Sequence, residues 1–236
     1  MGIRQRCCSA LVGMLLMPAA VWADYAHHPS PVFHAFWLEA QHGGGSENSV
    51  TDVELDGWIG GDRHKLWLKT DIKQHKGTLQ ESEFWAMYSR NVSEFWDFQT
   101  GIRLDTQPDS TGYFTLGVSG LAPYFLKTQA HLFVSDYGHI TARLKQSTHL
   151  LVTQRVGIEP YYRLEMAAQR VARQSLGQGL TNGRLGVRLN YEITRELSPY
   201  VDIRYDWKFG GTSSIANNND ERRDHFTLSL GVALMF

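Results

Sequence analysis

The sequence predicts an all-β protein: a transmembrane antiparallel up-and-down β-barrel of about 12 strands, preceded by a cleaved signal peptide. Three observations predict this fold. The chain opens with a secretory signal pattern. Apolar and polar residues then alternate over segments long enough to cross a bilayer. The chain ends in an alternating strand whose last residue is Phe236.

The first residues have the composition of an export signal. Arg4 and Arg6 give a positive start, residues 10–22 are largely apolar, and Val21-Trp22-Ala23 ends the run in a small-x-small pattern. Such a run is typical of a signal peptide and is too short for a transmembrane helix. We therefore expect residues 1–23 to be removed, residues 24–32 to form a short periplasmic linker and residues 33–236 to form the barrel.

Cysteine and charge content exclude several classes of function. Both cysteines, Cys7 and Cys8, lie in the signal segment, so we expect no disulfide, thiolate metal site or cysteine nucleophile in the mature chain. Without Arg4 and Arg6 the net charge is about −3 with neutral histidines. The basic residues form no clustered patch, and we expect no nucleic-acid partner.

The barrel strands are predicted from a period of two residues. Every second residue from Trp96 to Leu104 is apolar or Thr, and the residues between them, Asp97 to Asp105, are polar or Gly. A soluble β-sandwich alternates in the same way, but its strands average about 5–6 residues, whereas a tilted transmembrane strand needs about 9–11. The predicted strands are 33–41, 50–59, 63–71, 82–91, 95–105, 113–120, 124–134, 139–149, 155–167, 183–193, 199–209 and 225–236.

The predicted connections alternate in length. Short ones are expected at 60–62, 91–94, 120–123, 150–154 and 194–198, and longer ones at 42–49, 72–81, 106–112, 168–182 and 210–224. The tight turn at 135–138 is the exception. Short periplasmic turns and longer external loops are the pattern of bacterial outer-membrane barrels, so lipid and the barrel-assembly machinery are the expected partners.

The last strand carries a further signal. Apolar residues alternate from Phe226 to Phe236 without interruption. This strand resembles the C-terminal insertion signal of bacterial outer-membrane proteins, and the resemblance makes Phe236 the insertion signal of this chain.

Several stretches together resemble the copper resistance protein B family, from about residue 30 to the end. They include Gly60-Gly61-Asp62 running into 65–70, Tyr88-Ser89-Arg90, and the segments 117–124, 151–155, 191–201 and 207–212. The resemblance implies an outer-membrane protein of copper resistance or homeostasis, with copper as its ligand. It also implies action beside periplasmic copper-handling proteins such as a multicopper oxidase.

We therefore expect copper export, or copper binding at the cell envelope. The alternative is a small-solute or ion-selective channel that is not specific for copper. An enzyme is not expected, because Ser147-Thr148-His149 has the spacing of an outer-membrane lipase pair in reversed order and no nucleophile motif is present.

Candidate metal ligands are few. Members of the family often carry a Met- and His-rich segment before the barrel, whereas the linker here has two histidines and no methionine. The absence of thioether ligands weakens the case for Cu(I) storage in the linker. The candidates are His27, His28, His34, His131 and Met87.

Charged residues dominate the predicted inward face. One interpretation is a salt-bridge network that fills a narrow lumen, and the other is a path for cations; the first is favoured for most of the residues. The principal inward charges are Glu54, Lys65, Lys69, Glu83, Asp97, Arg103, Asp105, Arg163, Glu165, Arg188, Asp202, Arg204 and Asp206.

Overall fold

The computed structural model describes residues 31–236, apart from residues 46–48, 108, 172–173 and 219–221. The predicted signal peptide and nearly all of the predicted linker, with His27 and His28, lie outside the described residues.

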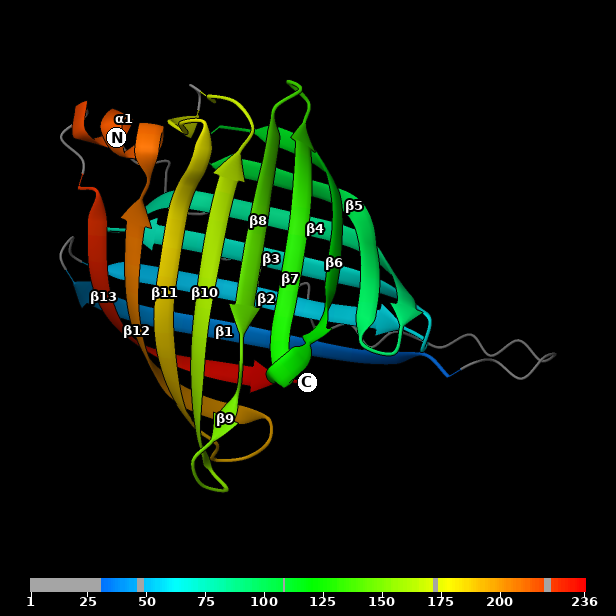
Figure 1. Cartoon of the computed structure of the whole chain (residues 1–236). Helices are drawn as coiled ribbons and strands as arrows, with labels where there is room; N and C mark the ends of the chain where they lie inside the picture. Colours follow the sequence, from blue (N-terminus) through cyan, green and yellow to red (C-terminus); the bar gives the residue numbers. More distant parts are fainter. Residues whose placement is uncertain (1–30, 46–48, 108, 172–173, 219–221) are drawn as a thin grey trace, which may run out of the picture. The chain divides into compact units, whose positions relative to one another are not determined.

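The described chain is a closed antiparallel barrel (Figure 1). β8 and β9 both pair with β10 and form one interrupted strand, so twelve strands make up the described wall. This confirms the predicted antiparallel β-barrel. The strands are β1 (Phe33–Gly45), β2 (Val50–Gly60), β3 (His64–His75), β4 (Thr78–Ser93), β5 (Trp96–Gln107), β6 (Thr111–Ala122), β7 (Leu126–Ser135), β8 (Ile140–Ser147), β9 (Leu150–Leu151), β10 (Val156–Ala167), β11 (Gly179–Tyr191), β12 (Leu197–Lys208) and β13 (Asp224–Met235).

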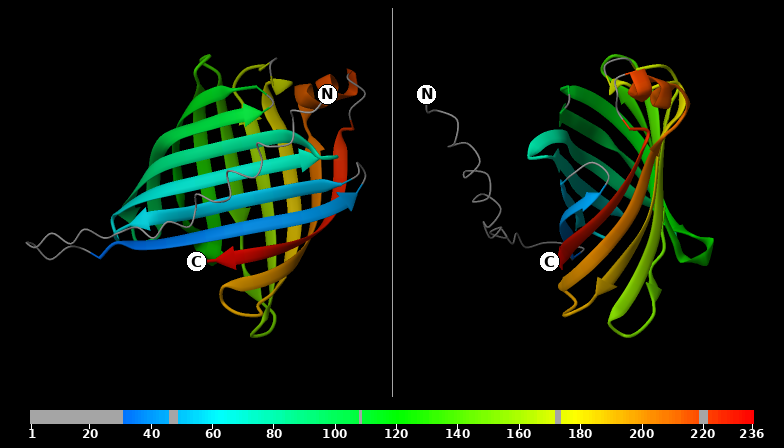
Figure 2. Two further views of the ribbon diagram at one scale, coloured as in Figure 1. Left: turned by 180° about the vertical axis from the view of Figure 1, so that it is seen from behind. Right: turned by 90° about the vertical axis from the view of Figure 1, so that its left-hand side faces the viewer.

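Closure comes from β1, which pairs with β2 on one side and with β13 on the other. Trp37 lies opposite Met235 in this last pairing. Apart from the two-residue β9, which pairs with β10 alone, each described strand therefore has two neighbours. Closure of this kind removes the long sheet edges on which backbone groups would face lipid. Figure 2 shows the strands of the opposite walls crossing at a steep angle, as expected of a strongly tilted barrel.

The two faces of the wall match the sequence alternation. On β5, Phe98 and Ile102 are 40% and 52% exposed on the outer face, while Gln99 and Arg103 are 1% and 8% exposed on the inner face. Large apolar side chains on the outside and polar ones on the inside are the reverse of a soluble protein and suit a lipid-facing surface. None of the helices among the described residues has the length and apolar character needed to cross a membrane.

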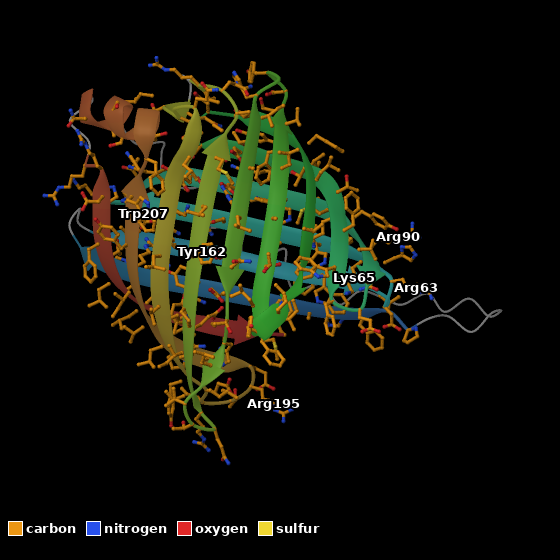
Figure 3. All side chains as sticks on the ribbon, in the orientation of Figure 1. Arg63, Lys65, Arg90, Tyr162, Arg195 and Trp207 are labelled. Atoms are coloured by element: carbon orange, nitrogen blue, oxygen red, sulfur yellow. The ribbon has the colours of Figure 1, made fainter. Side chains whose placement is uncertain are left out.

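Aromatic side chains mark both ends of the outer face. At the end where β1 begins and β13 ends, called here the terminal rim, Phe36 and Phe236 stack with ring centroids 6.1 Å apart. At the opposite end, called the distal rim, Trp207 packs between Tyr205 and Phe209 at 5.8 and 5.7 Å. Such girdles are typical of the two membrane–water interfaces. Figure 3 shows Arg63, Arg90 and Arg195 reaching outward at the terminal rim.

Three of the longer connections predicted from the sequence are wrong, because the strands continue into them. The segment predicted as a loop over 72–81 is the end of one strand, a tight turn and the start of the next. The turn residues Lys76 and Gly77 have φ of 52° and 75°, which is the backbone of a two-residue hairpin whose twist matches its strands. Similarly, β1 extends to Gly45 and β5 to Gln107.

The two remaining distal connections are long, as predicted. The last one contains a helix that was predicted as a loop, α1 (Gly210–Asn218). The Thr212 hydroxyl on this helix accepts a hydrogen bond from the Gly177 backbone N–H at 2.9 Å. This hydrogen bond joins the connection between β10 and β11 to the connection between β12 and β13 at the distal rim. At the terminal rim, β6 and β7 are joined by η2 (Pro123–Phe125).

Candidate functional site

The inner wall holds two tyrosine rings flat against the sheet. Tyr161 lies over Gly186 and Tyr200 lies over Gly231, and a Cβ at either glycine would overlap the ring beside it. Only glycine lets a ring approach the strand this closely. Because the rings lie along the wall, space remains in the middle of the barrel.

A cavity of about 550 Å³ occupies this space. Pockets of this size hold small ligands, usually with a few polar groups that fix the orientation. Here the lining is unusually rich in charge. Its acidic members are Glu39, Asp52, Glu54, Asp56, Asp71 and Glu159, its basic members are Lys73, Lys127, Lys145, Arg163, Arg184, Arg188 and Arg204, and its aromatic members are Trp37, Trp67, Tyr161 and Tyr200.

Ion pairs cross the lumen between strands that are not neighbours. Lys145 on β8 lies 3.1 Å from a carboxylate oxygen of Glu54 on β2. Arg163 on β10 lies 3.8 Å from Asp71 on β3. Both pairs connect opposite walls of the barrel, so they narrow the lumen.

A second group of cross-wall contacts lies near the closure of the barrel. Arg188 on β11 is 2.7 Å from Glu39 on β1 and stacks over the Tyr200 ring at 4.3 Å. Arg204 on β12 pairs with Asp52 on β2. A guanidinium can combine ion pairing with ring stacking because it is planar, which holds these side chains along the wall.

The other inward charges predicted from the sequence also have partners in the structure. Among them, Asp202 is fully buried and accepts hydrogen bonds from the Tyr161 hydroxyl at 2.9 and 3.0 Å. The remaining pairs are Lys65 with Asp97 at 3.3 Å, Lys69 with Asp56 at 3.1 Å, Arg143 with Glu165 at 2.9 Å, and Arg184 and Arg204 with Asp206 at 2.5 and 3.5 Å.

Arg103 lies at the centre of a dense cluster that fills another part of the lumen. Its guanidinium donates to Asp105 through two nitrogens at 2.7 Å and to Glu83 at 2.9 Å. Its charged carbon also lies 4.9 Å from the centroids of both the Tyr113 and Phe133 rings. Burying a cation this fully requires such paired hydrogen bonds, so the cluster is a packed polar core.

Met87 and His131 both belong to this region. Met87 is completely buried and packs with Trp85, Tyr113 and Phe133. The Nε2 atom of His131 is 2.9 Å from Gln99 Oε1, and its ring meets Trp85 edge-on at 5.4 Å. His131 also borders a small void of about 40 Å³ next to the main cavity. The imidazole thus already has a hydrogen-bond partner.

The predicted ligand His34 lies elsewhere. It is exposed at the start of β1, where its ring is 6.5 Å from Phe36. It therefore lies apart from the buried residues Met87 and His131. Within residues 31–236, leaving out the gaps already given, no group of three or more His, Cys, Asp or Glu side chains is arranged to hold a metal ion.

Sequence reasoning missed the aromatic part of the lumen. Trp85, Tyr113 and Phe133 lie on the inward faces of β4, β6 and β7 and surround Arg103. One feature of the sequence could have identified them: these aromatic residues lie among charged residues on the polar side of each strand. Such a position is unusual for aromatic residues in a water-filled lumen and indicates packing against another wall.

Two sets of relatives resemble this chain. The family model described as copper resistance protein B precursor (CopB) matches residues 34–236. Copper resistance protein B of Escherichia coli is 29% identical over 214 residues, which covers 90% of this chain and 72% of that protein. The copper resistance protein B homolog of Pseudomonas syringae pv. tomato is 31% identical over 225 residues, covering 92% of this chain and 76% of that protein.

Solved porin structures share the fold. The NanC porin superimposes with a TM-score of 0.58 at 12% identity, covering 84% of this chain and 98% of the porin. The KdgM porin gives a TM-score of 0.54 at 13% identity, covering 85% and 99%. At this identity the likeness concerns the barrel architecture alone.

Proposed function

Because the chain belongs to the copper resistance protein B family, we propose that its barrel contributes to copper tolerance by exporting copper or by binding it at the cell envelope. The family match extends over the whole barrel, and the barrel is porin-like, which places the protein in the bacterial outer membrane. The family supports a role in copper resistance, and the choice between export and binding is our proposal.

The observation that carries the proposal is the charged cavity inside a membrane-spanning wall. A space of about 550 Å³ is large enough for a hydrated or chelated metal ion. Carboxylate oxygens of Glu39, Glu54 and Asp56 line it, with side chains 26%, 33% and 23% exposed. Between the two routes, a space of this size inside the membrane-spanning wall favours passage of copper through the barrel.

The second route uses the histidines that precede the barrel. His27 and His28 are adjacent imidazoles, and imidazole is a good ligand for copper. In this version of the proposal the barrel anchors a copper-binding segment in the envelope. His131 remains a candidate for a weak site beside the cavity, and Met87 would first have to leave its aromatic cluster.

Copper tolerance of a strain that lacks the gene tests the proposal. We expect the deletion strain to stop growing at a lower copper concentration than its parent, and the wild-type gene to restore growth. Zinc tolerance is the control and should not change. Unchanged copper tolerance would remove the copper role and leave a small-solute channel in its place.

Complementation with a variant carrying both His27→Ala and His28→Ala distinguishes the two routes. Full restoration of tolerance would support export through the lumen. Failure to restore tolerance, at a normal level of folded barrel, would support binding by the N-terminal histidines.

A further inference from the structure

The cavity carries an almost balanced charge. Its lining has six acidic and seven basic side chains. Channels that select one sign of ion usually line their path with rings of the opposite charge. This lumen has no such excess, so its wall offers little electrostatic preference for a bare cation or a bare anion.

Five of the six acidic side chains are also already paired with a cation of the wall. Glu39 is held by Arg188, and Glu54 by Lys145. Asp56 is held by Lys69. A bare divalent ion that binds one of these carboxylates competes with a cation of the wall, and a cation that is displaced then lies unpaired beside the ion. Leaving one member of a buried pair without its partner is costly.

Neutral hydrogen-bonding side chains also line the cavity. They include Ser119, Gln129 and Ser147. A hydroxyl or a carboxamide can both donate and accept a hydrogen bond. This part of the lining therefore suits a solute that carries both donors and acceptors.

We propose that the cavity takes copper as a small, electrically neutral chelate and not as the bare hydrated ion. This inference rests on the proposed role in copper tolerance and names the form of the substrate. Copper(II) held by two amino-acid-type ligands, each giving one nitrogen and one oxygen, has no net charge and has the N,O coordination that Cu(II) favours. Its N–H groups and carboxylate oxygens match the available acceptors and donors, and a wall with balanced charge does not oppose its entry.

Copper entry into proteoliposomes tests the inference. The protein, purified from outer membranes, is reconstituted into vesicles that contain a copper-sensitive dye. Copper is then supplied at one concentration as the neutral bis(glycinate), as hydrated Cu(II) or as the anionic citrate complex. We expect the bis(glycinate) to enter several-fold faster than either other form. Equal or faster entry of hydrated Cu(II) or of the citrate complex would overturn the inference, as would the absence of entry in all three forms.

Two variants of one ion pair make the test sharper. Lys145→Gln leaves Glu54 without its cation, so the rate for hydrated Cu(II) should rise relative to bis(glycinate). Glu54→Gln leaves Lys145 unpaired, so the rate for the citrate complex should rise instead. Glu196→Gln, at an exposed position in the turn between β11 and β12, is the matched control and should behave as wild type. If both pair variants leave the order of the three rates unchanged, charge balance does not select the substrate and the inference is wrong.

This result is separable from the proposed function. Loss of copper tolerance in the deletion strain, together with fastest entry of hydrated Cu(II), would keep the copper role and overturn only the neutral chelate. Unchanged tolerance in the deletion strain would remove the copper role itself.

Discussion

Phe236, the last residue, is joined to Phe36 on the first strand through both backbone and side chain. The Phe36 N–H donates to the Phe236 carbonyl at 2.8 Å, and the Phe236 N–H donates to the Phe36 carbonyl at 3.0 Å. Their rings stack, and the Phe36 ring also covers Gly57 on the next strand. The final residue thus completes the seam that closes the barrel.

Replacing Phe236 with Ser should impair barrel assembly, because it removes the stacked ring at the seam while leaving the backbone pairing. The measurement is the amount of heat-modifiable, folded protein in outer-membrane fractions. Tyr124→Asn is the control, since Tyr124 is 94% exposed in the η2 turn. A normal yield of folded Phe236→Ser protein would contradict a role for this residue in assembly.

The closed barrel could be predicted because it depends on local alternation. Residues such as Phe98 and Gln99 differ in polarity at adjacent positions, and this difference alone assigns them to opposite faces. The partners across the lumen could not be predicted in the same way. Lys145 lies beside Glu54 only because of the tilt and stagger of the whole barrel. Neither property can be read from the sequence of one strand.

Arg103→Met should destabilise the folded barrel by about 3–5 kcal/mol, because it leaves the buried carboxylates of Glu83 and Asp105 without their shared cation. Urea unfolding of the protein in lipid vesicles measures this change. Arg195→Gln, at an exposed position of the terminal rim, is the matched control. Equal stability of Arg103→Met and wild type would show that the cluster is not a structural core.

Gly186→Ala should push the Tyr161 ring away from the wall and into the cavity. Overpacking of this kind costs about 1–3 kcal/mol, and the displaced ring should lower single-channel conductance in planar bilayers. Gly112→Ala is the control, because a Cβ there would make only an ordinary contact with Leu104 at 3.7 Å. An unchanged conductance in Gly186→Ala would mean that the space beside Tyr161 is not part of the conducting path.

Substituting alanine at both His27 and His28 is predicted to weaken copper binding to the folded protein, because it removes the adjacent imidazoles. Equilibrium dialysis with copper determined by mass spectrometry gives the amount bound. His131→Gln serves as a comparison, since it removes the imidazole beside the small void. Unchanged binding in the double variant would exclude a metal site at the N-terminal histidines.

The candidate site was predictable in its charges but not in its packing. The alternation of polar and apolar residues places Arg103 on the face of its strand that points into the lumen, and Phe133 lies among the charged residues of the same face. The alternation does not show that the ring of Phe133 stacks beside the guanidinium, because that contact joins β5 to β7 across β6. For the same reason the enclosure of Met87 by aromatic rings, which keeps it from acting as a ligand, could not be predicted from the sequence.

Cell-associated copper under copper stress, compared by mass spectrometry between a deletion strain and its complemented counterpart, tests the central claim most directly. Export through the lumen predicts more copper in the deletion strain, and complementation should return it to the parental level. Less copper in the deletion strain would instead support binding at the envelope. Equal copper in the two strains would contradict a role for this barrel in copper tolerance.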